Sequence, residues 1–86
     1  MYYVYILKSK QDDRLYKGFT RNLKTRLAKH KSGGAYTTKR MGDVELIYYE
    51  AFKGEKDAQR RENYLKTTKG KRTLKLIIRD SRGPVV

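Results

Sequence analysis

The chain has 86 residues, with 22 lysines and arginines against 9 acidic residues, a formal net charge of +13 and no cysteine. The lack of cysteine excludes disulfides and thiolate metal ligands, and every apolar stretch is far shorter than the roughly 20 residues that a membrane-spanning helix needs. We find no cleavable leader before the first apolar segment, so we expect a soluble, cytoplasmic protein. A surface this cationic attracts polyanions, which makes nucleic acid the first partner to consider.

The N-terminal segment has the pattern of a β-hairpin. Residues 2–8 and 15–19 are rich in aromatic and β-branched side chains, and a polar segment between them has the composition of a turn. Because side chains alternate between the two faces of a strand, Tyr5 and Tyr16 are expected on one face, where they can meet across the pair. Gly18 shares the face of Tyr16.

A helix is predicted over residues 22–31, with Thr20 as its N-cap and the glycines at 33–34 as its stop. At about 100° per residue, Arg26 and His30 lie one turn apart and beside the apolar stripe of this helix. Both side chains are therefore expected at the edge of the core.

A third strand is predicted over residues 44–52, which are apolar on both faces and are therefore expected at the centre of the sheet. A second helix follows over residues 55–66. Its inward positions are Ala58 and Leu65, and Glu62 falls between them on the same stripe. A carboxylate at an inward position is the most unusual feature of the sequence.

The apolar residues at 74–78 fit a third helix, although their alternation also fits a strand. Residues 81–86 contain glycine and proline and are expected to form a flexible tail. We therefore predict one α+β domain over residues 1–80. Its elements come in the order β-β-α-β-α-α, with a three-stranded, antiparallel-rich sheet against which the helices pack.

The inward Glu62 needs a positive partner, because burying an unpaired carboxylate is costly. An ion pair with Arg26 or Arg61 is one possibility. The other is a single divalent ion such as Mg²⁺, which takes its remaining ligands from water and substrate phosphate. His30 by itself fits a helix-end residue that faces solvent, but beside Arg26 it also fits a proton carrier next to a cation that binds phosphate.

Two residues of the second strand have both a structural and a functional interpretation. Tyr16 is either a packing group, as most strand tyrosines are, or a phenol drawn toward phenolate by surrounding cations and able to take a proton from water. Gly18 is either a bend in the strand or a place where a substrate or a metal shell approaches the backbone closely.

The chain resembles the GIY-YIG nuclease superfamily in several motifs that follow one another at the right spacing. The residues Tyr3-Val4-Tyr5 and Tyr16-Lys17-Gly18 resemble the two halves of its paired motif. Arg26, His30, the strand at 46–50 and the helix at 58–66 resemble its first helix, third strand and metal-binding helix. The resemblance runs from residue 1 to about residue 75 and is greatest to small stand-alone members related to the excinuclease nuclease domain. The first motif departs from the family pattern at Tyr3 and Val4, the second at Lys17, and a late asparagine and a proline before the third strand are missing.

The resemblance implies a metal-dependent endonuclease that hydrolyses DNA phosphodiester bonds, a role in DNA repair, one Mg²⁺ or Mn²⁺ and no small-molecule cofactor. Glu62 would bind the metal and Gly18 would support the site, and the catalytic residues would be Tyr5, Tyr16, Arg26 and His30. The expected partner is duplex or branched DNA, contacted by the basic residues Lys17, Arg21, Lys29, Lys39, Arg40, Arg61, Lys66 and Lys69. The alternative is a non-catalytic module that keeps the fold and the basic surface and binds DNA or structured RNA.

Overall fold

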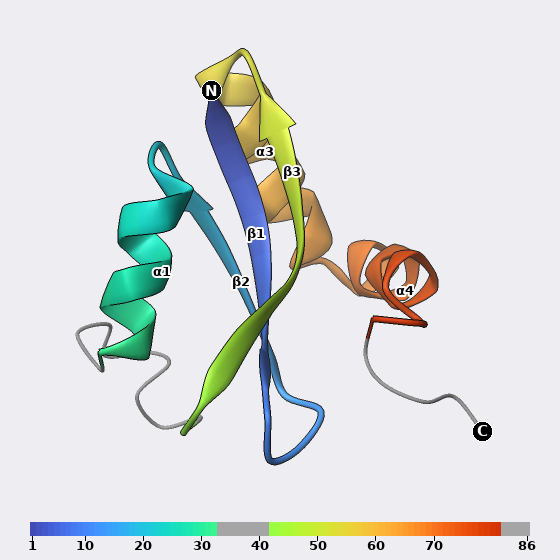
Figure 1. Cartoon of the computed structure of the whole chain (residues 1–86). Helices are drawn as coiled ribbons and strands as arrows, with labels where there is room; N and C mark the ends of the chain where they lie inside the picture. The colour runs from blue at the N-terminus through green and yellow to red at the C-terminus, as the bar shows by residue number, and fades with distance from the viewer. Residues whose placement is uncertain (33–41, 82–86) are drawn as a thin grey trace.

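A computed structural model describes residues 1–32 and 42–81. Three strands form one antiparallel sheet in the order β2-β1-β3. Helix α1 lies on one side of this sheet, and α3 and α4 lie on the other (Figure 1). The predicted α+β class and the predicted order of elements are confirmed, with the bounds β1 Tyr2–Ser9, β2 Leu15–Thr20, α1 Leu23–Lys31, β3 Val44–Phe52, α3 Glu55–Leu65 and α4 Thr68–Ile77.

The central strand is β1, and the prediction that residues 44–52 are central is wrong. All four side chains of Val4–Leu7 are buried, because β1 is paired on both edges and covered on both faces. Strand β3 is an edge strand, and Tyr49 in it is 51% exposed. A register shift opposite Ile6 and Leu7 leaves Ile47 as an extra residue in β3. This irregularity brings Ile47 and Tyr48 to the same apolar cluster, which explains why β3 has no clean alternation.

The sheet separates two apolar clusters. One lies under α3 and α4 and contains Val4 and Ile6 of β1. The other lies under α1 and contains Tyr5 and Leu7. The alternation predicted for β1 therefore holds, and Tyr5 faces α1.

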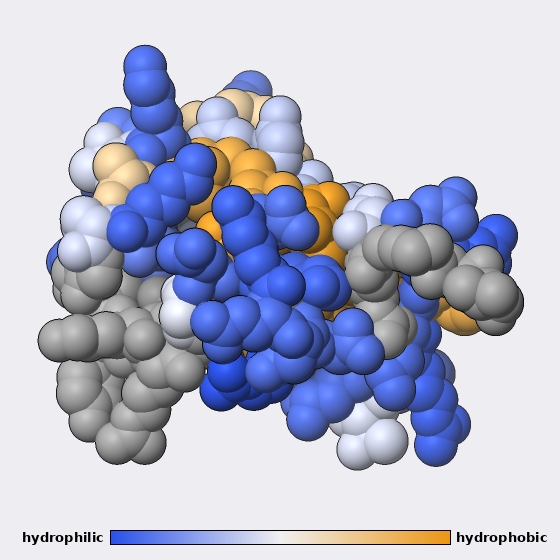
Figure 2. All heavy atoms as spheres, turned by 60° about the horizontal axis from the view of Figure 1, so that its bottom comes forward, coloured by the Kyte–Doolittle hydropathy of each residue, from blue (hydrophilic) through white to orange (hydrophobic). Residues whose placement is uncertain are grey.

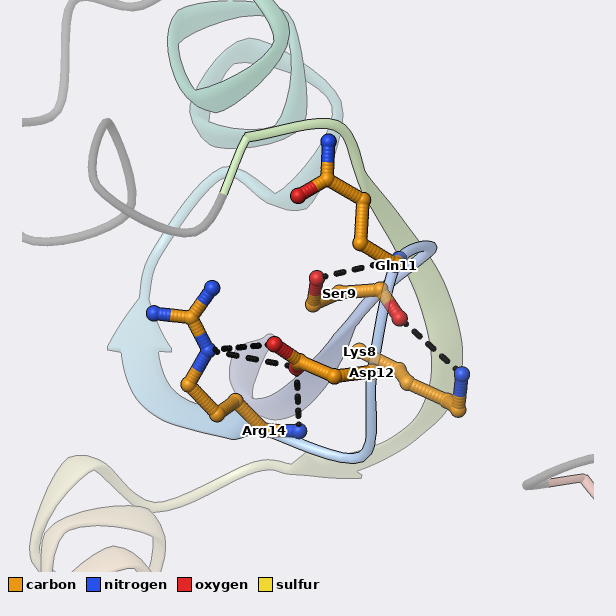
Figure 3. A network of polar contacts seen from close by, with 5 residues as sticks. All are labelled: Lys8, Ser9, Gln11, Asp12 and Arg14. Atoms are coloured by element: carbon orange, nitrogen blue, oxygen red, sulfur yellow. Dashed lines mark hydrogen bonds and ion pairs between the residues drawn. The ribbon is translucent and has the colours of Figure 1, made fainter.

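Polar side chains close the turn between β1 and β2 (Figure 3). The Asp12 carboxylate accepts hydrogen bonds from the backbone N–H of Arg14 at 2.9 Å and from its Nε at 2.9 and 3.1 Å. The Ser9 hydroxyl accepts one from the backbone N–H of Gln11 at 3.2 Å. These contacts hold the hairpin in the register that places Tyr5 opposite Gly18.

Helix α1 begins one residue later than predicted, and its N-cap is Asn22 rather than Thr20. The Asn22 side chain accepts a hydrogen bond from the backbone N–H of Thr25 at 3.0 Å. Thr20 instead accepts one from the backbone N–H of Asn22 at 3.1 Å, which ties the end of β2 to the start of the helix. The predicted stop at residues 33–34 lies outside the described residues.

The segment after α3 is a helix, which decides between the two interpretations of residues 74–78. Thr67 caps α4 by accepting a hydrogen bond from the backbone N–H of Gly70 at 3.0 Å. A Cβ at Gly70 would lie 1.8 Å from the carbonyl oxygen of Tyr64, so glycine is needed for α4 to pack this closely against the end of α3. Leu74 and Ile78 then reach the core.

Hydrophilic side chains cover most of the surface seen when the lower end of Figure 1 is turned toward the viewer (Figure 2). The part of the chain that the structure describes contains no helix with both the length and the apolar content needed to cross a bilayer. Residues 82–86, which make up most of the predicted tail, lie outside this part.

Candidate active site

Three rings from β1, β2 and α1 meet on the α1 side of the sheet. The ring centroids of Tyr5 and Tyr16 are 6.1 Å apart, as the alternation of the two strands predicts. The Tyr5 hydroxyl and His30 Nε2 are 2.8 Å apart and form a hydrogen bond. The Tyr16 and His30 centroids are 5.2 Å apart. The structure thus brings together two strand tyrosines and a histidine 25 residues away from the first of them.

The three rings differ in how far solvent reaches them. Tyr5 is fully buried and His30 is 6% exposed, while Tyr16 is half-buried. His30 is therefore not the solvent-facing helix-end residue that it could have been, because the last turn of α1 packs it against Tyr5. Tyr16 is the ring through which the cluster meets solvent.

Burial sets the protonation of this cluster. It raises the pKa of Tyr5 to about 12, with the neighbouring Tyr16 adding to the rise and Arg26 opposing it. Burial also lowers the pKa of His30, and the positive charges of Arg26 and Lys29 lower it further. At neutral pH Tyr5 is therefore a protonated phenol and His30 a neutral imidazole, whose tautomer decides which of the two donates. At Tyr5 the effect of burial thus outweighs the nearby positive charge of Arg26.

Gly18 makes room for the ring of Tyr5. A Cβ at Gly18 would lie 2.3 Å from Cζ and 2.4 Å from the hydroxyl oxygen of Tyr5, which is its direct neighbour across the β1–β2 pair. The expectation that Gly18 leaves space for a substrate or a metal shell is corrected, because a buried side chain fills that space.

Arg26 lies on α1 beside this cluster and is half-buried. It also lines an open groove of about 360 Å³ between the end of β2 and the start of α1, together with Phe19, Thr20, Arg21, Asn22 and Thr25. A ligand in this groove can therefore reach a guanidinium that is itself next to Tyr5.

Glu62 lies on α3, on the other side of the sheet from the three rings. Its side chain is 18% exposed, in keeping with its place between two buried residues of the helix, and its Oε2 is 3.2 Å from Lys66 Nζ. The ion pair that the sequence allowed with Arg26 or Arg61 forms with Lys66 instead. Residues four apart on a helix share a face, so Lys66 reaches the carboxylate, while Arg26 lies beyond the sheet.

Arg61 points instead to β3 and binds Glu50 with two hydrogen bonds, Nε to Oε1 at 2.8 Å and Nη2 to Oε2 at 3.0 Å. The hydroxyl of Tyr48 donates to the same carboxylate. Arg61 was predicted to contact nucleic acid, but its guanidinium is taken up by this ion pair. Glu50 was not among the predicted residues, although strand alternation places it on the face of Tyr48 and toward α3.

Lys17, Lys66 and Lys71 lie near one another on the α3 side of the sheet, and Lys66 is the one that pairs with Glu62. Lys17 is half-buried on the α3 face of β2, and its pKa is lowered by burial and then by the charges of Lys71 and Lys66. Tyr16 and Lys17 are consecutive residues of an edge strand and point to opposite faces. The ring cluster and the Glu62 region are therefore separated by β2, which is an edge strand of the sheet in the part of the chain that the structure describes.

The side chains present limit the metals that could bind. Within residues 1–32 and 42–81, no three histidine, aspartate or glutamate side chains lie close enough together to form a metal site. Glu62 offers one half-buried carboxylate. This donor set fits only an ion such as Mg²⁺, which keeps most of its water and draws other ligands from phosphate.

The other basic residues predicted to contact nucleic acid are on the surface where they are described. Arg21, Lys29 and Lys69 are exposed, and the Arg21 guanidinium lies 5.6 Å from the ring centroid of Tyr2. Lys39 and Arg40 lie outside the described residues.

Comparison with known proteins identifies the family of the chain. The family model described as the GIY-YIG catalytic domain matches residues 1–75. The chain is 46% identical to a UPF0213 protein of Clostridium perfringens, over 90% of this chain and 83% of the relative, and 44% identical to one of Staphylococcus haemolyticus, over 88% and 93%. It is also similar to the solution NMR structure of a UPF0213 protein from Bacillus halodurans, with a TM-score of 0.55 and 34% identity over 90% of this chain and 85% of that one. The chain belongs to the GIY-YIG catalytic domain family.

Proposed function

We propose that this protein is an endonuclease that hydrolyses a DNA phosphodiester bond with the help of one divalent ion. The observation that carries the proposal is the buried hydrogen bond between Tyr5 and His30, with Tyr16 and Arg26 beside it. This arrangement places a phenol, an imidazole and a guanidinium together in a member of a nuclease family. The net charge of +13 supports a polyanionic substrate.

Each side chain of the cluster has a role that matches its exposure and charge. Arg26 lines an open groove and would bind the scissile phosphate, whose charge grows in the transition state. Tyr16 is the accessible phenol and would orient the attacking water. His30 is neutral at pH 7 and, as the tautomer that donates from Nε2 to the Tyr5 oxygen, would accept at Nδ1 the proton that the water loses. Tyr5 is fully buried, so we assign it the positioning of His30 rather than contact with substrate.

Glu62 would hold the Mg²⁺ or Mn²⁺ ion, which when bound would polarise a phosphate oxygen of the DNA backbone and offset its charge. A DNA backbone that crosses the outer edge of β2 would meet Arg26 on one side of the sheet and the Glu62 region on the other. The Lys66 side chain, which is 52% exposed and has a flexible stem, would bind a phosphate oxygen in place of the carboxylate if Glu62 held the ion.

A plasmid-relaxation assay tests the proposal, with Mg²⁺ or Mn²⁺ compared with EDTA. We expect Arg26→Ala and Glu62→Gln to abolish ion-dependent nicking while DNA is still retained in a mobility-shift assay. Glu45→Gln, at an exposed position of β3, is the matched control for the change of charge and should cut like the wild type. Normal nicking by both Arg26→Ala and Glu62→Gln would refute the assignment of these residues.

The non-catalytic alternative has one observation in its favour, which is that Lys66 neutralises Glu62. A protein of this kind would bind DNA or structured RNA without needing a metal. Wild-type protein that shifts DNA but nicks it with neither ion would favour this alternative.

A further inference from the structure

A second groove lies on the other flank of α1, between this helix and the sheet. Its volume is about 540 Å³, and it is lined by Tyr3, Arg21, Asn22, Leu23, Lys24, Leu27 and Tyr49. Tyr49 is a large aromatic residue on an edge strand and is 51% exposed. The ring of Tyr3 supports it from the side, with centroids 6.0 Å apart and an angle of 62° between the planes. The Tyr49 ring thus packs against Tyr3 while much of the residue faces solvent.

Positive charge lines the same groove. Arg21 and Lys24 are both exposed, and none of the described residues that line the groove is acidic. Arg21 and Asn22 also line the groove that contains Arg26. The two grooves therefore share Arg21 and Asn22 as a common wall at the start of α1, and a chain of phosphates that crosses this wall would run from Arg26 to Tyr49.

We propose that the Tyr49 groove binds a single-stranded stretch of the DNA substrate next to the scissile phosphate, with one base stacked on Tyr49 and phosphates against Arg21 and Lys24. This inference rests on the proposed function, because it takes DNA bound at Arg26 as its starting point. It deepens that function by naming the substrate as DNA with unpaired nucleotides beside the cut.

The chemistry of the groove favours a single strand over other occupants. Every base has a flat face that stacks on an aromatic ring, and unpaired bases expose these faces, whereas the bases of an intact duplex already stack on their neighbours. The flanking arginine and lysine suit the regular negative charge of the backbone. A second copy of this chain carries the same +13 charge and would be repelled from this surface.

Binding is measured by fluorescence anisotropy with a labelled single-stranded oligonucleotide in EDTA, so that no cleavage occurs. We expect Tyr49→Ala to weaken binding about tenfold, as the loss of one stacked base does, and Tyr49→Phe to retain most of the affinity. The fitted slope of log affinity against log salt should stay unchanged in Tyr49→Ala and fall by about one unit in Arg21→Gln. Leu76→Ala on α4, which removes another exposed apolar side chain, should bind like the wild type.

Paired probes separate stacking from a general loss of binding. A blunt duplex should bind Tyr49→Ala and the wild type with equal affinity. An abasic oligonucleotide has no bases to stack, so the wild type should bind it as weakly as Tyr49→Ala binds the normal single strand. Unchanged affinity of Tyr49→Ala for the single strand, or an equal loss for the duplex, would overturn the inference. The binding measurements all contain EDTA, so they do not depend on cleavage. A wild-type protein that nicks no DNA in the plasmid assay, but loses single-strand affinity on Tyr49→Ala, would refute the proposed nuclease function and leave the groove assignment standing.

Discussion

The close approach of Gly18 and Tyr5 makes Gly18→Ala the most informative single substitution. The added Cβ would lie 2.3 Å from Cζ of Tyr5, whereas carbon atoms in contact prefer about 3.5 to 4.0 Å. Tyr5 is fully buried and hydrogen-bonded to His30, so it has no free space in which to turn away. One of the two paired strands or the ring itself must therefore move by about 1 Å.

The expected cost follows from these contacts. Overpacking a buried site costs about 1 to 3 kcal/mol, and losing the hydrogen bond to His30 adds about 1 kcal/mol. Alanine recovers about 0.5 to 1 kcal/mol, because it loses less backbone entropy in a strand than glycine. The net loss of about 1 to 3 kcal/mol in the free energy of unfolding should lower the melting temperature by roughly 5 to 20 °C in a domain of this size.

Thermal and urea unfolding measure this loss, and a double-mutant cycle assigns it to the contact. Replacing Tyr5 by leucine removes the ring atoms that the new Cβ meets, so Gly18→Ala should cost much less in a Tyr5→Leu background than in the wild type. Tyr5→Phe keeps Cζ and should give no such relief. If Gly18→Ala melts at the wild-type temperature, or if its cost is the same in both backgrounds, the packing argument is wrong.

Three further predictions concern charge. Burial lowers the pKa of His30 in the folded state, so the unfolded chain binds a proton more readily. The free energy of unfolding should therefore be level above about pH 6.5, fall as the pH drops below it, and level off below the folded pKa. Urea titrations of His30→Asn from about pH 5 to 7.5 should lack this pH-dependent component, and an unchanged dependence on pH would contradict the assignment. Arg61→Ala should destabilise the fold by about 1 to 3 kcal/mol, because it leaves the carboxylate of Glu50, whose side chain is 17% exposed, without its cation. Arg60→Ala breaks the exposed pair with Asp57 and should change stability by less than about 0.5 kcal/mol, so equal losses in the two variants would refute this distinction. Lys69→Gln should reduce the salt dependence of DNA binding by about one unit of slope without lowering the melting temperature, and a lower melting temperature would show a structural role instead.

Local patterns predicted most of the secondary structure because each element has signals within its own segment. The alternation of residues 2–8 placed Tyr5 on the face of Tyr16, and helical spacing placed Glu62 between two buried residues, both as observed. The strand at 44–52 has the predicted bounds but not the predicted position in the sheet. An apolar strand can be central or can carry exposed aromatic residues at an edge, and only pairing between distant segments decides between these.

The partners of charged groups were the least predictable part of the site. Helical spacing allows Glu62 to meet either a neighbour on its own helix or a cation from elsewhere, and the structure selects Lys66 because Arg61 turns toward Glu50. The reason for Gly18 was equally hidden, since a glycine in a strand gives no sign of which side chain fills its place. Such contacts depend on several elements packing at once.

The sequence by itself determined the order of the elements, the type of all but the last, the positive charge of the surface and the motifs that mark the family, because these depend on residues close together in the chain or on composition. Only the tertiary structure decided that Tyr5 is a buried support for His30, that the Glu62 region lies across the edge strand from Arg26, and that Tyr49 stands exposed in a basic groove. Burial, pKa and access to a ligand arise from atoms that come together in space, and no local pattern specifies them.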